Sequence, residues 1–298
     1  MIEVQGLTKI YPGNKGIKGI SFRVAAGETF GFLGPNGAGK TTTIRLLMGF
    51  IKAQAGYARI NGLDCWRDST EIKRLVGYLP GEINFIENMS GEEFLNLMAG
   101  MHGQASVLRK RYRELADRWN LNLQQPIRKM SKGTKQKVGL VYAFMLDSPV
   151  LILDEPTSGL DPLMQKVFVD TILEEKSCGK TIFISSHIFP EIERTCDRVA
   201  MLKEGELIAI EDIHVLRQAQ QRLFEIEAED AEDVRKLLDS GLEIVHCERN
   251  RVTLRVYGDI NPLCQILAGI RLKDFASQTA DLEEAFLHFY LAKGHKDE

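Results

Sequence analysis

Two short segments of this 298-residue chain have residue types and spacing suited to chemistry on a nucleotide phosphate. The first, Gly34–Thr41, reads GPNGAGKT and stands between a strand pattern, Thr29–Leu33, and a helical pattern, Thr42–Phe50. That order of strand, glycine-rich loop and helix is the setting that a phosphate-binding loop requires. The residues expected to contact the nucleotide here are Gly34, Asn36, Gly37, Ala38, Gly39, Lys40, Thr41 and Thr42.

Each residue type in this loop has a defined use. Glycines let backbone N–H groups turn toward a β-phosphate, and the helix that follows directs its positive end to the same place. Lys40 is expected to bridge the β- and γ-phosphates, and the hydroxyl of Thr41 to ligate Mg²⁺. The loop therefore predicts binding of a nucleotide together with Mg²⁺.

The second segment is an apolar strand pattern, Val150–Leu153, that ends in two adjacent carboxylates, Asp154 and Glu155. Two acids at the carboxyl end of a buried strand are costly unless a cation or a reaction uses them. Asp154 is expected to hold Mg²⁺, directly or through water, and Glu155 to take the proton from an attacking water. A plain surface strand end is the alternative, and the phosphate loop makes it less favoured.

Strand and helix patterns alternate through the first 210 residues, which indicates an α/β framework for these segments. Nearly unbroken apolar runs at Val150–Leu153 and Thr181–Ile184 are typical of central strands in a mainly parallel sheet, buried on both faces. The predicted strands are Ile2–Leu7, Ile20–Val24, Thr29–Leu33, Tyr57–Ile60, Val76–Leu79, Val150–Leu153, Thr181–Ile184, Arg198–Leu202 and Glu206–Ile210.

Strand patterns are absent between Ser90 and Leu146, where three helical patterns follow one another. We expect a helical insertion over about residues 88–147 of the sheet domain, with ordinary crossover helices as the alternative. Ten basic residues lie between Arg109 and Lys137. A solvated helical face is the favoured explanation, anionic lipid the next, and nucleic acid the least favoured because aromatic residues are not interleaved.

The character of the chain changes after about residue 218. From Arg222 onward there are 10 basic and 16 acidic residues, a net charge of −6. The patterns run strand, helix, strand, strand, helix, strand and a last helix, Asp281–Leu291, which suggests a small ferredoxin-like α+β domain. We therefore predict a main domain, residues 1–218, and an accessory domain, residues 219–298, without a catalytic constellation.

The composition excludes several classes of protein. With 44% hydrophobic residues, 27% charged residues and a net charge of −3, the chain is neither disordered nor a coat for nucleic acid. The longest stretch without Asp, Glu, Lys or Arg, Phe94–Leu108, has 15 residues, too few to span a membrane. The start lacks a secretory signal and the five cysteines lack metal or redox spacing, so we expect a cytoplasmic protein with reduced, buried thiols.

With these motifs in order, roughly the first 215 residues resemble the nucleotide-binding subunit of an ATP-binding-cassette (ABC) transporter. The resemblance implies a P-loop NTPase fold that binds ATP and Mg²⁺. It places Tyr11 against the adenine ring and His187, as the family's switch histidine, at the γ-phosphate. Lys40, Glu155 and His187 are then the expected catalytic residues.

Two further segments are similar to parts that the family shares between two subunits. Met130–Lys137, with the sequence MSKGTKQK, resembles the signature loop and retains its Ser131 and Gly133. In the family this loop completes the ATP site of a second, head-to-tail cassette, and Ser158–Asp161 resembles the segment that couples the two sites. The resemblance thus implies dimerisation on ATP, as a homodimer or with a different cassette, with Ser131, Gly133 and Asp161 near the nucleotide. Ser131 also reads independently as the N-cap of the helix that follows it.

The chain departs from the family pattern at two places. Met130, Lys132 and Thr134 replace the usual leucine, glycine and glutamine of the signature loop, a form associated with bacterial export cassettes. Gly81 stands where the family commonly has a glutamine that contacts Mg²⁺ and water, and the neighbouring Glu82 is the expected substitute. Turnover is still expected because the catalytic residues are present.

The partner is expected to be a membrane protein. The ending Ala280–Leu287 resembles the tail of bacterial exporter subunits whose permease is a separate chain, which favours export over import. Phe85, Ile86 and Met89 are expected either to receive a helix of that permease or to pack in the core. We predict an ATP-hydrolysing transporter subunit at the cytoplasmic membrane face; the alternative is a soluble ABC-type ATPase acting on the ribosome or on nucleic acid, and no nucleic-acid partner is expected.

Overall fold

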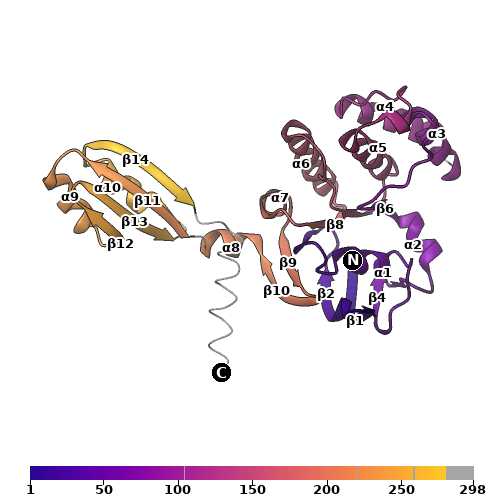
Figure 1. Ribbon diagram of the computed structural model, residues 1–298, viewed down its shortest axis with the longest axis horizontal. Helices are drawn as coiled ribbons and strands as arrows, with labels where there is room; N and C mark the ends of the chain where they lie inside the picture. Colours follow the sequence, from indigo (N-terminus) through magenta and orange to yellow (C-terminus); the bar gives the residue numbers. More distant parts are fainter. Residues whose placement is uncertain (104, 220, 258, 280–298) are drawn as a thin grey trace. The chain divides into compact units, whose positions relative to one another are not determined.

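The computed structural model describes residues 1–103, 105–219, 221–257 and 259–279 and divides into two compact units (Figure 1). The units are Met1–Ile210 and Glu211–Glu298, so the division precedes helix α8 (Ile213–Ala219), whereas the predicted domain boundary stands at its end. The predicted helix Asp281–Leu291 and the exporter-like ending Ala280–Leu287 lie outside the described residues.

The first unit contains a six-stranded sheet whose central strands are parallel. β3 pairs in parallel with β8 and β9, and β7 pairs in parallel with β6 and β8, as the unbroken apolar runs predict. The phosphate loop follows β3 and the acid pair stands at the end of β7. Both therefore lie at the same edge of the sheet, because the carboxyl ends of parallel strands lie together. The spatial order is β10 (Glu206–Asp212), β9 (Arg198–Lys203), β3 (Thr29–Leu33), β8 (Thr181–Ser186), β7 (Val150–Asp154) and β6 (Val76–Leu79).

A four-stranded antiparallel sheet forms the other layer of this unit. Its first hairpin runs from Ile2 opposite Val24 to Tyr11 opposite Lys15, with two shifts of register. Both strands are longer than predicted, because these bulges interrupt the alternation of apolar residues without ending the hairpin. The order is β2 (Lys15–Val24), β1 (Ile2–Tyr11), β4 (Ala55–Ile60) and β5 (Leu63–Asp64).

Helix α1 (Lys40–Leu47) lies between the two sheets, in contact with β2 and β4 on one side and β7 on the other. Aromatic rings fill the shared core beneath it: the Phe22 and Phe30 rings are stacked 5.6 Å apart, and the Phe32 and Phe183 rings are 5.2 Å apart. The loop that precedes α1 is therefore held on a rigid base. The remaining helices on this sheet are α2 (Ser69–Leu75), α6 (Pro162–Ser177) and α7 (Phe189–Thr195).

Three helices lie between β6 and β7, and Figure 1 shows them together at one end of the first unit. Trp119 and Tyr112 are fully buried among them, so this group has a core of its own. Ser90 and Glu93 form a capping box at the start of the first helix. The elements are α3 (Gly91–Met101), α4 (Ala105–Arg118), the short 3₁₀ turn η1 (Ile127–Lys129) and α5 (Lys132–Met145).

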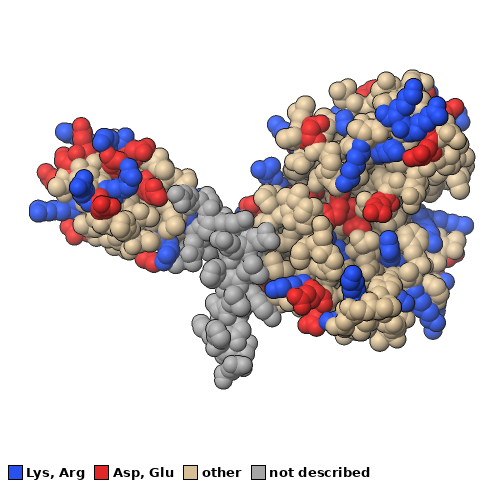
Figure 2. Space-filling view, viewed as in Figure 1, with Lys and Arg blue, Asp and Glu red and all other residues tan. Residues whose placement is uncertain are grey.

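Half of the ten basic residues between Arg109 and Lys137 in this helical group are paired with acids. Figure 2 shows Lys and Arg side chains gathered over it with Asp and Glu side chains among them. Arg111 lies 2.9 Å from Asp147, Arg113 lies 2.8 Å from Glu92, and Arg118 also pairs with a glutamate. Such pairing fits a solvated helical face, because paired basic side chains have less positive charge available to attract anionic lipid or nucleic acid.

The second unit has one four-stranded sheet whose neighbouring strands are all antiparallel. With a helix after the first and after the third strand, this is the split arrangement of the ferredoxin-like fold that the pattern predicts. Both helices contribute to one apolar core under the sheet, through Val234, Leu237 and Leu263. The order is β12 (Glu243–Glu248), β13 (Arg251–Tyr257), β11 (Gln221–Ala228) and β14 (Leu272–Thr279), with helices α9 (Ala231–Leu238) and α10 (Asn261–Leu267).

The expectation that all thiols are buried is wrong for three of the five cysteines. Cys65 and Cys196 are buried, whereas Cys178, Cys247 and Cys264 are exposed. Position explains the difference: Cys178 caps the end of α6, Cys247 lies on an edge strand exposed along its whole length, and Cys264 lies on the helix α10, where Leu263 is the buried residue.

Candidate nucleotide site

The glycine-rich segment forms a tight loop from β3 into α1. Gly39 caps the helix with φ of 110°, a left-handed conformation that favours glycine, and a Cβ there would lie 2.6 Å from the Ile17 side chain. A Cβ at Gly34 would lie 2.3 Å from the carbonyl oxygen of Leu202. Both glycines are therefore required by close packing, and the loop places α1 with its N-terminus toward the site.

A hollow of about 330 Å³ lies over this loop and contains most of the predicted nucleotide contacts. Tyr11 enters it from the end of β1 and Glu155 from the end of β7. Gly34 and Ala38 are buried behind the loop, and the N–H of Ala38 donates to the Pro35 carbonyl. The predicted loop residues that line the hollow are Asn36, Gly37, Gly39, Lys40, Thr41 and Thr42.

Lys40 is 5% exposed and its ammonium group contacts three acceptors. Its Nζ donates to the carbonyl oxygens of Gly34 and Pro35 at 2.6 and 3.2 Å, and lies 2.9 Å from Glu155 Oε1. The phosphate-loop lysine and the proposed base therefore form an ion pair across the hollow. An anion that binds Lys40 competes directly with the Glu155 carboxylate for the same ammonium group.

Glu155 also contacts the histidine that sequence reasoning selected. Its Oε2 lies 2.6 Å from His187 Nδ1, and the His187 side chain is 46% exposed. The Glu155 backbone has φ of 48°, an uncommon value for a residue other than glycine. Its N–H donates to the carbonyl and hydroxyl oxygens of Ser185. This turn at the end of β7 directs the carboxylate toward both Lys40 and His187.

Asp154 is fully buried beside this pair. The Ser185 hydroxyl donates to its Oδ1, while its Oδ2 is buried without a hydrogen-bond partner among the described residues. Burial raises the pKa of Asp154, and the hydroxyl groups of Ser185 and Thr41 oppose this rise only in part. A buried carboxylate oxygen without a partner, next to a threonine hydroxyl, fits the oxygen ligands that Mg²⁺ requires.

Sequence reasoning missed two residues that hold the acid pair in place. One is Ser185, which bonds both acids as described. The other is Gln136, a buried residue of α5 whose Nε2 donates to the carbonyl oxygens of Glu155 and Pro156 at 3.2 and 2.9 Å. A polar residue on the buried side of an apolar helix was the available signal, because such a group needs a partner.

The signature-like segment lies outside the hollow of the phosphate loop. Ser131 caps α5 by accepting the N–H of Thr134, which confirms the predicted N-cap. A Cβ at Gly133 would lie 2.3 Å from the carbonyl oxygen of Gly159, so glycine is needed for this close approach. Asp161 does not line the hollow either: its carboxylate caps α6 by accepting the N–H of Met164.

Gly81 packs directly on the acid pair. A Cβ at this position would lie 3.2 Å from Asp154 Oδ2, so a larger side chain there requires a small adjustment. Gly81 and Glu82 line a second hollow, of about 630 Å³, together with Glu155 and His187. Glu82 is exposed and lines the same hollow as Glu155, the proposed base.

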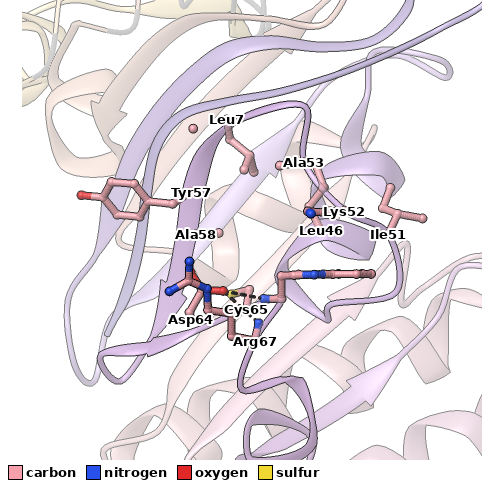
Figure 3. A pocket seen from close by; sticks show the side chains of 12 residues that line it. Leu7, Leu46, Ile51, Lys52, Ala53, Tyr57, Ala58, Asp64, Cys65 and Arg67 are labelled. Carbon is pink, nitrogen blue, oxygen red and sulfur yellow. Dashed lines mark hydrogen bonds between the residues drawn. The ribbon is translucent and has the colours of Figure 1, made fainter.

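A third hollow, of about 260 Å³, lies in the antiparallel sheet, and none of the predicted site residues lines it (Figure 3). Leu7 and Ile51 are among the apolar residues that line it, with Asp64 and Arg67 close together elsewhere in its wall. Asp64 Oδ1 accepts the backbone N–H groups of Trp66 and Arg67. Its carboxylate therefore shapes a turn, and the chemistry of this unit gathers at the edge with Lys40 and Glu155.

Comparison with known proteins gives consistent relatives. A family model described as ABC transporter matches residues 17–158. An ABC transporter ATP-binding protein of Nostoc sp. is 45% identical over 197 residues, which are 64% of this chain and 58% of that protein. The Nod factor export ATP-binding protein I of Burkholderia lata is 33% identical over 293 residues, 96% of this chain and 95% of that protein. The chain thus spans less than two thirds of the Nostoc relative and nearly all of the Burkholderia one.

Solved structures resemble the first unit in particular. The structure of an ATP-binding subunit of an ABC transporter matches with a TM-score of 0.67 and 33% identity, over 73% of this chain and 92% of that chain. A dimeric ATP-binding cassette in a post-hydrolysis state, bound to ADP and Pi, matches with a TM-score of 0.65 over 72% of this chain and 99% of that chain. At 22% identity, the second likeness shows the fold alone.

Proposed function

Because this chain belongs to the ABC transporter family of ATP-binding proteins, we propose that it hydrolyses ATP and drives a separate membrane permease. The observation that carries the proposal is the contact of Glu155 with both Lys40, at 2.9 Å, and His187, at 2.6 Å. A phosphate-loop lysine, a carboxylate base and a histidine that meet at one sheet edge are the groups that phosphoryl transfer to water requires.

The ion pair between Lys40 and Glu155 determines the sequence of steps in the proposed reaction. When the β- and γ-phosphates bind the loop, Lys40 exchanges the carboxylate for phosphate oxygens. Glu155 is then free to accept a proton from the attacking water, and His187 holds the carboxylate through its Nδ1. Tyr11 stacks on adenine, and the N-terminus of α1 faces the phosphate oxygens.

We propose that Thr41 and Asp154 hold the Mg²⁺ ion that accompanies ATP. When bound, the ion neutralises charge on the phosphate oxygens. Asp154 is suited to this role because its Oδ2 is buried and has no other partner among the described residues. Gly81, which packs against Asp154, stands where the family commonly has glutamine, and Glu82 is the acid nearest along the chain to that position.

We propose that two copies, or this chain and another cassette, close on ATP. Ser131 and Gly133 do not line the hollow that contains Lys40, which supports a signature loop supplied by a second subunit. The proposal is supported by the dimeric cassette bound to ADP and Pi, whose fold this chain shares. Asp161, which caps α6, stands next to Leu160 and Gly159 in the segment that would couple the two sites.

The permease is proposed to be a separate integral-membrane protein, and the direction to be export. The name of the Burkholderia relative, a Nod factor export protein, supports export and gives no support to the alternative of a ribosome- or nucleic-acid-bound ATPase. No helix in the described ranges of the chain has both the length and the hydropathy to cross a bilayer. Attachment to the membrane is therefore proposed to depend on the partner.

The surface proposed for the permease lies between Gly81 and Met89. Ile86 is 46% exposed, while Phe85 is half-buried with its ring 5.0 Å from that of Phe94. Apolar residues at the base of the helical group, next to the loop of Gly81, are suited to transmit closure of the site to a partner helix. The second unit, which lacks the chemistry of the first, is proposed to act in assembly or regulation.

Two measurements test the proposed function. Purified protein should release phosphate from ATP only with Mg²⁺, and cells that express the proposed permease should recruit it to membranes. Ile86→Asp should weaken this recruitment, because it places a charge in an apolar contact, and should leave basal ATPase nearly unchanged. Absence of ATP turnover would refute the enzymatic part, and equal membrane association with and without the permease would refute the transport part.

A further inference from the structure

A buried carboxylate stands behind the catalytic pair and has no part in the reaction described above. Glu191, on α7, is only 8% exposed. One of its oxygens, Oε2, accepts two hydrogen bonds: the Ser186 hydroxyl donates to it at 2.7 Å and the Thr157 hydroxyl at 3.0 Å. Burying a carboxylate is costly, so these bonds and the place of the residue need a physical explanation.

The two hydroxyl groups belong to the two segments that carry the proposed catalytic residues. Thr157 lies two residues after Glu155, and Ser186 directly precedes His187. Asp154 is the last paired residue of β7, so Thr157 lies beyond that strand, whereas Ser186 is the last residue of β8 and pairs with Leu33 of β3. Ser186 Oγ also accepts the N–H of Ile188, which fixes the turn into α7. Glu191 thus joins the segment beyond β7 to the last residue of β8, which directly precedes His187.

Packing alone does not hold Glu191. A cavity of about 480 Å³ lies between α6 and α7, with Glu191 and Thr157 in its wall. On this side α7 faces open space rather than close-packed side chains, so the position of the carboxylate depends on its hydrogen bonds. Its second oxygen, Oε1, is buried and has no hydrogen-bond partner among the described residues.

We propose that Glu191 is a positioning residue for ATP hydrolysis, whose carboxylate ties the segment after β7 to the end of β8 and so sets the contact between Glu155 and His187. The proposal rests on the proposed ATPase function. It assigns Glu191 no contact with ATP: the residue acts through Thr157 and Ser186, and the phosphate-loop residues bind nucleotide without it.

The electrostatic surroundings make this tie sensitive to pH. Burial raises the pKa of Glu191 to about 7; the hydrogen bonds from Ser186 and Thr157 and the nearby His187 oppose the rise, and the charge of Glu155 adds to it. Hydroxyl groups bond a carboxylate more strongly than a carboxylic acid. The tie is therefore strongest above pH 7 and weakens as the pH falls through that value. The charged and titratable groups that face Glu191 are Glu155, His187, Lys166, Asp170, Arg194 and Cys196.

Two substitutions separate this role from a general loss of structure. Glu191→Ala removes both bonds, and we expect kcat to fall about 10- to 100-fold, because small misplacement of catalytic groups has effects of that size. KM for ATP should stay within about twofold, since nucleotide binding is left intact. Glu191→Gln keeps one acceptor oxygen and cannot ionise, so it should restore most of kcat at pH 8 and lose the decline near pH 7. Asp170→Asn, an exposed acid of α6 on the same cavity, is the matched control and should change none of these.

Hydrogen exchange of the full-length protein without nucleotide gives a readout that does not depend on turnover. Residues 155–161 and 185–188 should exchange faster in Glu191→Ala than in wild type, and at nearly wild-type rates in Glu191→Gln. Unchanged exchange and unchanged kcat in a folded Glu191→Ala would overturn the proposal, as would a wild-type pH profile in Glu191→Gln. If the wild type itself shows no ATP turnover, the proposed function fails, and hydrogen exchange alone decides whether Glu191 ties the two segments.

Discussion

Buried carboxylates near the nucleotide site of the first unit and lysine-paired carboxylates of the second unit have pKa values shifted in opposite directions. In the first unit, burial raises the pKa of Asp154 and raises that of Glu191 to about 7. In the second unit, hydrogen bonds, first of all from lysine side chains, lower the pKa values of Glu227 and Asp233. Glu227 is 2.7 Å from Lys273, and Asp233 is 2.7 Å from a lysine of its own helix.

This difference distinguishes carboxylates that serve a ligand or a reaction from carboxylates that stabilise the fold. A carboxylate that is buried at a strand end with an unpaired oxygen makes folding less favourable, so its presence needs a ligand or a reaction to explain it. A carboxylate paired with a lysine, whether half-buried like Glu227 or buried like Asp233, contributes to the fold and needs no further role. On this ground we place the chemistry in the first unit and propose assembly or regulation for the second.

The largest expected effect comes from replacing Glu155 with glutamine, and the matching acid-to-amide change in the second unit serves as its control. Glu155→Gln removes the proposed base and should lower ATP turnover about 10²- to 10⁴-fold. ATP binding should persist, because Lys40 then has no carboxylate competing for its ammonium group. Turnover and ATP-dependent dimerisation of the purified proteins are the measurements.

The matched change in the second unit is Glu227→Gln, which breaks pairs with Lys273 and Arg251. Turnover should stay near the wild-type value. Undiminished turnover in Glu155→Gln would remove Glu155 from its role, and a large loss in Glu227→Gln would show that the second unit takes part in the chemistry.

The second prediction concerns Ser131, which lies in the first unit outside its nucleotide hollow. Ser131→Arg should abolish turnover yet leave nucleotide binding by the monomer intact, whereas Lys40→Ala should weaken binding itself. Mixing the two inactive proteins should restore part of the turnover, because a mixed dimer has one site with both Lys40 and Ser131 unchanged. Full activity of Ser131→Arg by itself would exclude a shared site.

Much of the first unit was predictable because local patterns determine it. The strands β3 and β6 have the predicted bounds, and unbroken apolar runs indicated the parallel sheet. The hairpin of β1 and β2 was predicted too short, since its bulges depend on pairing between strands. The two-residue strand β5 has too little sequence to form a pattern at all.

The site was predictable where a residue type has few other uses. A lysine in a glycine-rich loop and two acids after an apolar strand led to Lys40 and Glu155, which the fold brings to 2.9 Å. Gln136, Ser185 and Glu191 were missed because their importance lies in partners far along the chain. Asp161, expected near the nucleotide, precedes a proline at the start of α6 and serves locally as a helix cap.

The third prediction uses thiols, of which two of the three in the first unit are buried and both in the second unit are exposed. Burial raises the pKa values of Cys65 and Cys196, both in the first unit, to about 12. Because the thiolate is the reactive form, iodoacetamide at pH 8 should label them at least about tenfold more slowly than the exposed Cys247 and Cys264 of the second unit. Mass spectrometry of labelled peptides measures the rates, and unfolding in denaturant should make all of the rates similar. Native labelling of Cys65 as fast as that of Cys247 would contradict the burial on which this prediction depends.

The smallest expected effect is the acid sensitivity of the second unit, where the pKa of Asp233 is shifted in the opposite direction from that of Glu191. Hydrogen bonds from Lys236 and from the backbone N–H of Arg271 lower the pKa of Asp233 from its usual 3.8. A lowered pKa means that Asp233 stabilises the folded unit above the unfolded-state pKa, and that this contribution is lost as the pH falls through the folded-state value. Asp233→Asn should therefore weaken protection of α9 and β13 from hydrogen exchange at pH 5 and change it little at the lowest pH that the fold survives. Glu232→Gln, an exposed neighbour on the same helix, should leave protection unchanged at both, and equal losses in the two variants would mean that helix charge, rather than the bonds of Asp233, supports this unit.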